Sequence, residues 1–171
     1  MALHVALLEP LPPTTTGAIA NCCAAVDASL HVVGPLPYPV DDTDLRSAGP
    51  ENWDGLDFWV HPGWRAFRDA MSRERCLYFA LDGERDAADA PFRANSVLVI
   101  GNADGILPER ILHKYPDRIY RLPTPPRKRS VDLGASVELL LAVAAKGVKE
   151  PAVKSGGVEV KPTAPVRFGR R

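Results

Sequence analysis

Long apolar runs and paired cysteines are both missing from this sequence, and each absence narrows the class of protein. No window of eighteen apolar residues occurs, and no charged leader precedes an apolar segment at the N-terminus. Neither membrane spanning nor secretion is therefore expected. The sequence contains three cysteines, an odd number. Adjacent residues such as Cys22 and Cys23 are poorly placed to form a disulfide with each other. We expect Cys22, Cys23 and Cys76 to be reduced, buried thiols of an intracellular protein, cytoplasmic or organellar (mitochondrial).

Motifs for metal binding, nucleophilic catalysis and dinucleotide binding are also missing. The histidines lack the spacing of metal ligands, so no metal site is expected at His4, His31, His61 and His113. Ser130 has no evident His and Asp partners for a catalytic triad. No G-x-G-x-x-G follows the first strand, and the GNADG of residues 101–105 lacks that spacing. A standard dinucleotide-binding fold is therefore disfavoured.

The net charge is zero, but the charges are unevenly distributed. Seven Lys or Arg and two Glu follow Ala145, whereas 14 basic and 19 acidic residues precede that point. The body is thus acidic and the C-terminal segment basic. Bulk charge cannot hold such a protein on nucleic acid, so a polyanion would have to meet local patches and the tail.

Apolar runs that alternate with helical patterns indicate a single α/β domain with a parallel sheet. The 171 residues, 46% of them apolar, suffice for one full core. We expect Thr16 to cap the first helix. The expected strands cover residues 3–8, 30–33, 56–60, 76–81, 97–101 and 118–122, and the expected helices 17–26, a short one near Asp44, 62–71, 108–113 and 131–145. The domain spans residues 1–146, and residues 147–171 are expected to form a flexible, basic tail containing Pro and Gly.

The segment YRLPTPPRKRSVDLGASVELLLAVAAK, residues 120–146, combines a strand end, a proline-rich basic loop and an apolar helix. Prolines at positions 123, 125 and 126 preset an extended path. Three cations, Arg127, Lys128 and Arg129, then stand just before Ser130 at the expected helix start. The sequence predicts that this loop meets an anion.

Five aromatic residues are concentrated between positions 53 and 67. Such residues can stack on nucleotides, but a cluster that spans a strand and a helix start is more often core or dimer interface. We expect core or interface for Trp53, Phe58, Trp59, Trp64 and Phe67.

Three segments in the same order resemble the signature segments of the SPOUT methyltransferases. These segments are VALLEPLPPTTTGAIAN, VLVIGNADGILP and YRLPTPPRKRSVDLGASVELLL. The sequence is most similar to the group that methylates the ribose 2′-oxygen at the wobble nucleotide of tRNA, and the similarity covers residues 3 to 146. The resemblance implies a parallel sheet whose C-terminal part is threaded into a deep trefoil knot, an exception to the rule that chains stay unknotted.

The resemblance also implies a cofactor, a partner and site residues. Members of the family are dimers, so a homodimer or a heterodimer with another SPOUT chain is expected, and they bind S-adenosylmethionine in the knot. Matched residue by residue, the cofactor positions are Leu81, Gly101, Leu122 and Ser130. The basic residues 127–129 are expected to contact RNA, tRNA or rRNA, through its phosphates.

Several positions depart from the family pattern. In the family, the first segment usually carries Asn, Thr, Gly and Asn, followed one helical turn later by an Arg that handles the substrate. In this chain the first Asn is replaced by Thr15 and the Arg by Asn21. A neutral amide neither anchors a phosphate by charge nor acts as a base. The usual Glu of the middle segment is Ala103, and in the third segment Arg129 and Ser130 are retained while the usual Asn is Asp132.

Three functional hypotheses follow from this mixture. The first is an active S-adenosylmethionine-dependent RNA 2′-O-methyltransferase in which Arg129 or a partner group replaces the arginine lost at Asn21. The second is a catalytically inactive SPOUT protein that binds RNA or a ribosome-assembly particle, or is the inert half of a heterodimer. The third is an ordinary doubly wound module that binds some other nucleotide.

Overall fold

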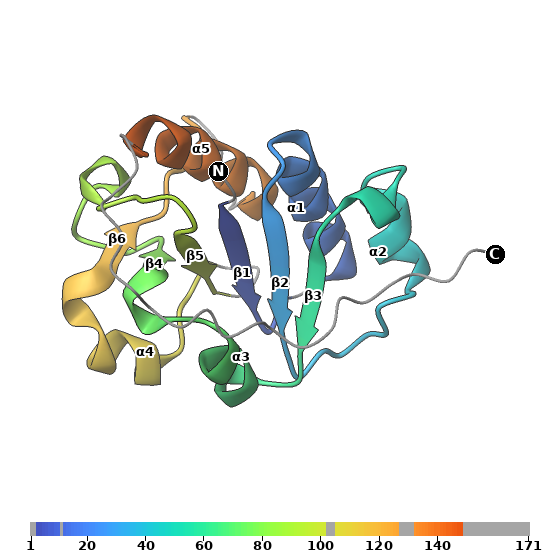
Figure 1. The fold of residues 1–171 in the computed structure, drawn as a ribbon, viewed down its shortest axis with the longest axis horizontal. Helices are drawn as coiled ribbons and strands as arrows, with labels where there is room; N and C mark the ends of the chain where they lie inside the picture. The colour runs from blue at the N-terminus through green and yellow to red at the C-terminus, as the bar shows by residue number, and fades with distance from the viewer. Residues whose placement is uncertain (1–2, 11, 102–104, 127–131, 149–171) are drawn as a thin grey trace.

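The chain folds around one six-stranded, wholly parallel sheet with the strand order β3-β2-β1-β5-β4-β6 (Figure 1). The computed structural model describes residues 3–10, 12–101, 105–126 and 132–148. The strands are short and rich in Val, Leu and aromatic residues, as buried parallel strands require. They are β1 (His4–Leu8), β2 (Ser29–Val33), β3 (Phe58–His61), β4 (Cys76–Ala80), β5 (Val97–Ile100) and β6 (Ile119–Arg121).

The described part of the chain contains five α-helices, four between strands and one after the last strand. The predicted α/β class is confirmed, and every predicted strand and all helices except the first agree with the structure within two residues. The helices are α1 (Pro13–Ala25), α2 (Thr43–Ala48), α3 (Trp64–Ala70), α4 (Glu109–Lys114) and α5 (Leu133–Gly147), and a short 3₁₀ turn, η3 (Ala87–Asp89), lies between β4 and β5.

The two faces of the sheet are covered by different helices. Alternate strand residues face α1, α2 and α5 on one side, where Val5, Leu30 and Leu98 join the larger hydrophobic cluster. The other residues of the strands face α3 and α4, where Phe67 and Ile111 are buried. Within the described part of the chain, no helix has the length and apolar character needed to cross a bilayer.

The predicted aromatic cluster is divided between these two faces. Trp53 and Phe58 pack edge to face on the α1 side, with ring centroids 5.5 Å apart, and both are buried. Phe67 is buried on the α3 side, whereas Trp59 and Trp64 are half-buried. The core interpretation is therefore confirmed for Trp53, Phe58 and Phe67.

The start of α1 corrects the predicted capping role of Thr16. The helix begins at Pro13, four residues earlier than expected, because proline is well suited to the first helical position, where no N–H is needed. Thr16 therefore lies inside the helix, buried, and its hydroxyl is 2.8 Å from the hydroxyl of Tyr38. Thr16 joins α1 to the loop after β2 instead of capping the helix.

The last helix begins two residues later than expected, at Leu133. Asp132 caps it, since the carboxylate accepts a hydrogen bond from the backbone N–H of Ala135 at 3.0 Å. Leu133, Val137, Leu140 and Ala144 are buried on one side of the helix, in agreement with the apolar helix predicted here.

Candidate functional site

Three of the four predicted cofactor residues lie at the carboxyl ends of neighbouring strands. Leu81, Gly101 and Leu122 directly follow β4, β5 and β6, which are adjacent in the sheet. The edge formed by the carboxyl ends of parallel strands is where ligands bind in open α/β sheets. The fourth residue, Ser130, and the predicted RNA-binding residues Arg127, Lys128 and Arg129 lie outside the described residues.

Gly105 packs against two of these residues, a role that was not predicted from the sequence. Its carbonyl accepts a hydrogen bond from the N–H of Leu81 at 3.2 Å. Its φ is +67°, and a Cβ at this position would stand 2.9 Å from Cγ of Leu81 and 3.5 Å from Cδ2 of Leu122. Both the backbone conformation and the space therefore favour glycine. The only signal in the sequence was the second glycine of GNADG.

Gly101 is packed as closely as Gly105. A Cβ at Gly101 would collide with the backbone carbonyl of Ile106, so the chain after β5 turns back directly over the strand end. Ile106 itself is 58% exposed, which is unusual for an aliphatic side chain beside two tightly packed glycines. Backbone and aliphatic side chains therefore meet closely at these strand ends, and we name the group Leu81, Gly101, Gly105 and Leu122 the cradle.

The cradle offers backbone acceptors between apolar walls. The carbonyl oxygens of Leu81 and Leu122 accept no hydrogen bond from any described residue, whereas the N–H of Leu122 donates to Ala80 at 2.8 Å. Leu122 is buried and Leu81 half-buried. Apolar surroundings with a few directed polar groups are typical of small-molecule sites, and backbone carbonyls without a described donor suit the amino group of an adenine.

Two arginines hold the loop that follows Leu81. Arg121 donates from Nε to the carbonyl of Gly83 at 2.9 Å and from Nη2 to that of Glu84 at 3.2 Å. Arg85 donates to the carbonyl of Asp117 at 2.6 Å and also pairs with its carboxylate at 3.7 Å. These contacts hold the loop that directly follows Leu81 of the cradle. No sequence motif had indicated them.

The altered position Asn21 takes part in a structural contact. Its side-chain amide donates a 2.7 Å hydrogen bond to the carbonyl of Ala48, the last residue of α2. The amide therefore ties α2 to α1. Nearby on the same helix, Thr16 contacts Tyr38, and burial raises the pKa of the Tyr38 hydroxyl, although the hydrogen bond to Thr16 opposes that shift.

Three of the four histidines form a hydrogen-bonded chain across three strands, which their spacing in the sequence did not indicate. Nδ1 of His4 is 3.0 Å from Nε2 of His31, and Nδ1 of His31 is 3.0 Å from Nε2 of His61. Burial lowers the pKa of His31 to about 2, helped by the charges of His4 and His61, and burial alone lowers that of His61 to about 4. Neutral, mutually bonded rings of this kind are core structure.

The cysteines are free thiols, as predicted. Cys23 and Cys76 are buried, and burial raises the pKa of both, that of Cys76 to about 11. Cys22 differs from the prediction because it is half-buried. In the described residues, no group of three or more His, Cys, Asp or Glu is arranged to hold a metal ion.

Comparison with known proteins identifies the family. The model of the SpoU rRNA Methylase family matches residues 2–142, which is most of the chain and includes the whole cradle. The chain belongs to the SpoU methylase family. The predicted resemblance to SPOUT methyltransferases is thereby confirmed, and the third hypothesis, an unrelated nucleotide-binding module, is excluded.

Relatives within the SpoU family carry tRNA methyltransferase names. The tRNA (cytidine(34)-2'-O)-methyltransferase of Methylovorus glucosotrophus is 31% identical over 138 residues, covering 80% of this chain and 90% of the relative. A putative tRNA (cytidine(34)-2'-O)-methyltransferase of Bacillus subtilis is 28% identical, covering 82% of this chain and 90% of its own. These relatives are bacterial and give no support to the mitochondrial alternative.

Solved SpoU structures share the fold. A structure that concerns 2-OH methylation of C/U34 on tRNA has a TM-score of 0.74 at 28% identity and covers 85% of this chain and 90% of its own. An AdoMet-bound rRNA methyltransferase from Sinorhizobium meliloti has a TM-score of 0.63 at 20% identity, covering 86% of this chain and 57% of its own. SpoU methyltransferases use S-adenosylmethionine.

Proposed function

We propose that this protein is an S-adenosylmethionine-dependent tRNA ribose 2′-O-methyltransferase that acts at the wobble nucleotide. The observation that carries the proposal is the cradle formed by Leu81, Gly101, Gly105 and Leu122 at adjacent strand ends. The carbonyls of Leu81 and Leu122, which accept no hydrogen bond from a described residue, and the aliphatic side chains around them fit an adenosyl group. The family membership and the names of the relatives support the same reaction and substrate class.

The residues of the chain would share the work as follows. S-adenosylmethionine, when bound, supplies an electrophilic methyl group on a sulfonium. Leu81, Leu122 and the two glycines hold its adenosyl part, together with Ser130, and exclude water from it. Arg129 would contact the RNA substrate and orient its ribose hydroxyl and a neighbouring phosphate through its positive charge. Arg127 and Lys128 add phosphate contacts.

One observation favours a second candidate, an inactive protein that binds RNA. Asn21 stands where the family has an arginine, and its amide is engaged with the carbonyl of Ala48. A neutral side chain in that contact neither anchors a phosphate nor helps to remove a proton. In this alternative the cradle and the fold are retained for binding, in a ribosome-assembly factor or in the inert half of a heterodimer.

Two measurements separate these functions. Calorimetry with S-adenosylmethionine tests the cradle, and no heat of binding at millimolar ligand would contradict both candidates. Transfer of labelled methyl to tRNA transcripts, with mass spectrometry of nucleotide 34, tests the reaction. We expect transfer by the wild-type protein and none by Arg129→Ala. Binding of the cofactor without transfer to any tRNA or rRNA transcript would establish the inactive alternative.

The proposal includes the deep trefoil knot expected of the family. The packing of α5 supports it, because α5 contacts α1 and also η3, which lies in the connection between β4 and β5. A Cβ at Gly147 would stand 2.6 Å from the ring of Phe92 in the same connection. An experimental backbone trace that leads from Pro126 to Asp132 without passing through this connection would contradict the knot.

The proposal also includes a dimer, of like chains or with another SPOUT chain, located in the cytoplasm where tRNA is modified. Apolar side chains on the outside of the α1 and α5 layer support it, since Val26 is 53% and Leu139 38% exposed. Light scattering of the purified protein tests the dimer. We expect twice the chain mass of 18.5 kDa for a homodimer, and the single mass after Leu139→Asp.

A further inference from the structure

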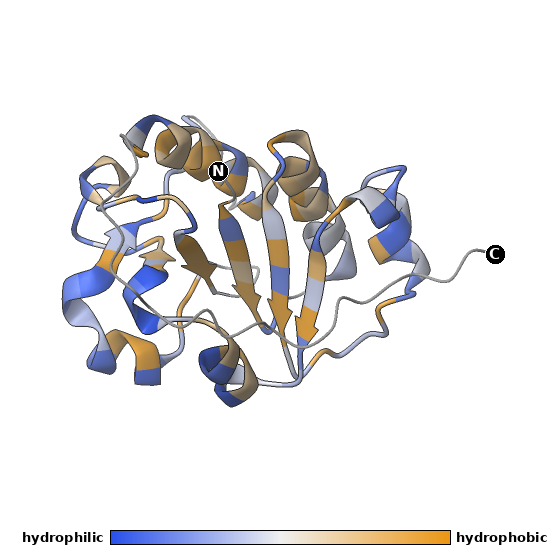
Figure 2. Ribbon diagram, in the orientation of Figure 1, coloured by the Kyte–Doolittle hydropathy of each residue, from blue (hydrophilic) through white to orange (hydrophobic). Residues whose placement is uncertain are grey.

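Basic residues are concentrated on the face of the sheet covered by α3 and α4. Two segments, residues 64–75 and 109–118, contain seven Lys or Arg and four Asp or Glu, whereas the other residues up to Ala145 contain seven basic and fifteen acidic residues. In Figure 2 both α3 and α4 carry strongly hydrophilic residues (blue) beside apolar ones (orange). We name this set the basic face, and it consists of Arg65, Arg68, Arg73, Arg75, Arg110, Lys114 and Arg118.

The two segments of the basic face are joined to each other. Arg118 donates a 2.6 Å hydrogen bond to the carbonyl of Arg73, so the end of the α4 segment touches the turn after α3. Arg68 and Arg118 both lie close enough to Cys76 for their charges to lower the pKa of its thiol, against the larger effect of burial. These contacts bring the two segments of the basic face side by side.

The positive charges of this surface are not neutralised within the described chain. None of the seven side chains forms an ion pair with a described carboxylate. Asp117, which lies within the second segment, pairs with Arg85 outside the basic face. Unpaired like charges held side by side repel one another, and a bound polyanion relieves that repulsion.

Aromatic rings hold two of the cations in place. The guanidinium carbon of Arg68 lies 5.9 Å from the ring centroid of Trp64 and 5.8 Å from that of Tyr115. Lys114 Nζ lies 5.8 Å from the same ring of Tyr115, which stacks on Tyr78 of β4 at 5.1 Å. Nε of Arg68 is buried without a hydrogen-bond partner among the described residues, so ring contacts position this side chain. Cations ordered in advance lose less entropy on binding.

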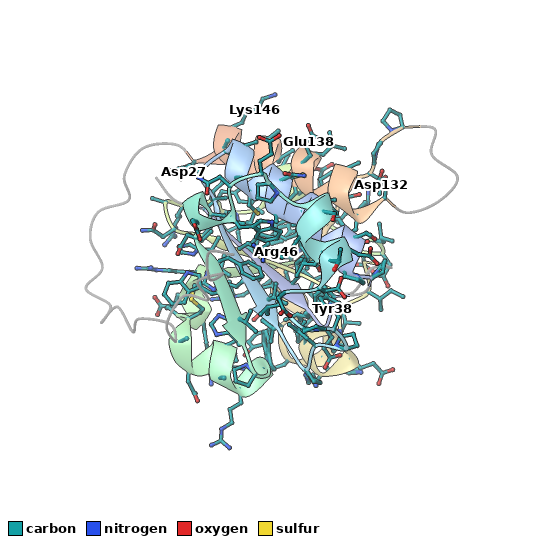
Figure 3. All side chains as sticks on the ribbon, turned by 90° about the vertical axis from the view of Figure 1, so that its right-hand side faces the viewer. Asp27, Tyr38, Arg46, Asp132, Glu138 and Lys146 are labelled. Atoms are coloured by element: carbon teal, nitrogen blue, oxygen red, sulfur yellow. The ribbon has the colours of Figure 1, made fainter. Side chains whose placement is uncertain are left out.

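The opposite layer of the molecule carries acidic groups. Figure 3 shows Asp132 and Glu138 along α5 and Asp27 beyond the end of α1, at the outer side of the α1 and α5 layer. These carboxylates make that layer less favourable for a phosphate backbone than the basic face, although Lys146 also lies on α5. The basic face also adjoins the cradle, because α4 begins at Glu109, four residues after Gly105.

We propose that the basic face binds the phosphate backbone of the RNA substrate and leads it to the cradle. This inference rests on the proposed function for its choice of polyanion. Six of the seven cations are arginines, whose planar fork matches phosphate oxygens. The basic face thus provides a local positive charge complementary to RNA phosphates, although the net charge of the chain is zero.

The test compares two double variants with the same change of charge. Arg65→Glu/Arg110→Glu alters two exposed positions of the basic face, and Arg93→Glu/Lys146→Glu alters two exposed positions outside it. Fluorescence anisotropy measures binding of a labelled tRNA anticodon stem-loop over a series of potassium chloride concentrations. Calorimetry with S-adenosylmethionine checks that both variants retain the cradle.

We expect the basic-face variant to bind RNA about tenfold or more weakly at about 100 mM salt. The slope of log Kd against log salt concentration should fall by about 1 to 2. The matched control should change the Kd by less than about threefold. Equal losses in both variants, or no loss in either, overturn the proposal, as does binding of polyglutamate as tight as that of RNA. If wild-type protein binds RNA through this face but transfers no methyl group, the proposed function fails and the basic face stands.

Discussion

The buried histidine chain predicts a loss of stability in mildly acidic solution. His31 and His61 are fully buried, their rings are bonded to each other, and no described carboxylate pairs with either. Burial lowers the pKa of His31 to about 2 and that of His61 to about 4, so both stay neutral in the folded protein at pH 5. In the unfolded chain both take up protons below a pKa of about 6.5. Because the unfolded state then binds more protons, stability falls as the pH falls.

The magnitude follows from proton linkage. Between pH 6 and pH 5, each histidine that is neutral when folded and titrates at about 6.5 when unfolded costs about 1.2 kcal/mol. His31 and His61 together should therefore remove about 2.4 kcal/mol, a large share of a typical stability of about 5–15 kcal/mol. The loss is absent above about pH 7.5, where the unfolded chain is also neutral.

Urea unfolding at pH 6 and pH 5 measures this loss. With a slope of about 2 kcal/mol per molar urea, the midpoint should fall by about 1 M. His113→Asn is the control, because His113 is exposed and lies outside the chain of rings, and it should show the same loss as the wild type. Free energies of unfolding that agree within about 0.5 kcal/mol at the two pH values would refute the reasoning.

Three further perturbations test the site. Gly105→Ala, which forces an alanine to a φ of +67° against Leu81, should weaken S-adenosylmethionine binding by about 1–2 kcal/mol in calorimetry, whereas Gly63→Ala, whose Cβ would meet only the carbonyl oxygen of Gly34 at 3.9 Å, should not. Asn21→Ala removes the hydrogen bond to Ala48 and should lower the free energy of unfolding by about 1 kcal/mol in urea titrations; an unchanged midpoint would contradict that contact. Arg129→Ala should abolish methyl transfer but leave cofactor affinity unchanged, and full activity in this variant would remove Arg129 from the reaction.

The layered fold was largely predictable because its determinants are local. Runs such as VLVI of β5 are apolar without interruption, as a strand buried on both faces must be, and the short link between α1 and β2 implies a parallel pair. The start of α1 was the exception. Thr16 looked like a helix cap in the sequence, but Pro13 begins the helix and the hydroxyl of Thr16 finds a partner in Tyr38, a contact made through tertiary structure.

The candidate site was predictable only in part. Leu81, Gly101 and Leu122 could be placed at strand ends because each follows an apolar run. Gly105 could not be assigned a role, since its φ and its contact with Leu81 depend on how the chain turns after β5. The same holds for Arg121, whose side chain reaches two carbonyls of a loop 37 and 38 residues away in sequence.

By itself, the sequence determined that buried strands alternate with helices in one domain and that the strand ends carry small and apolar residues, because burial and turn chemistry leave local periodic patterns. Only the tertiary structure decided that β5, β4 and β6 are neighbours, that His4, His31 and His61 meet across three strands, and that residues 64–75 and 109–118, which hold seven cations, come together. Strand order and helix placement arise from contacts between residues far apart in the chain, and those contacts leave no periodic pattern in the sequence.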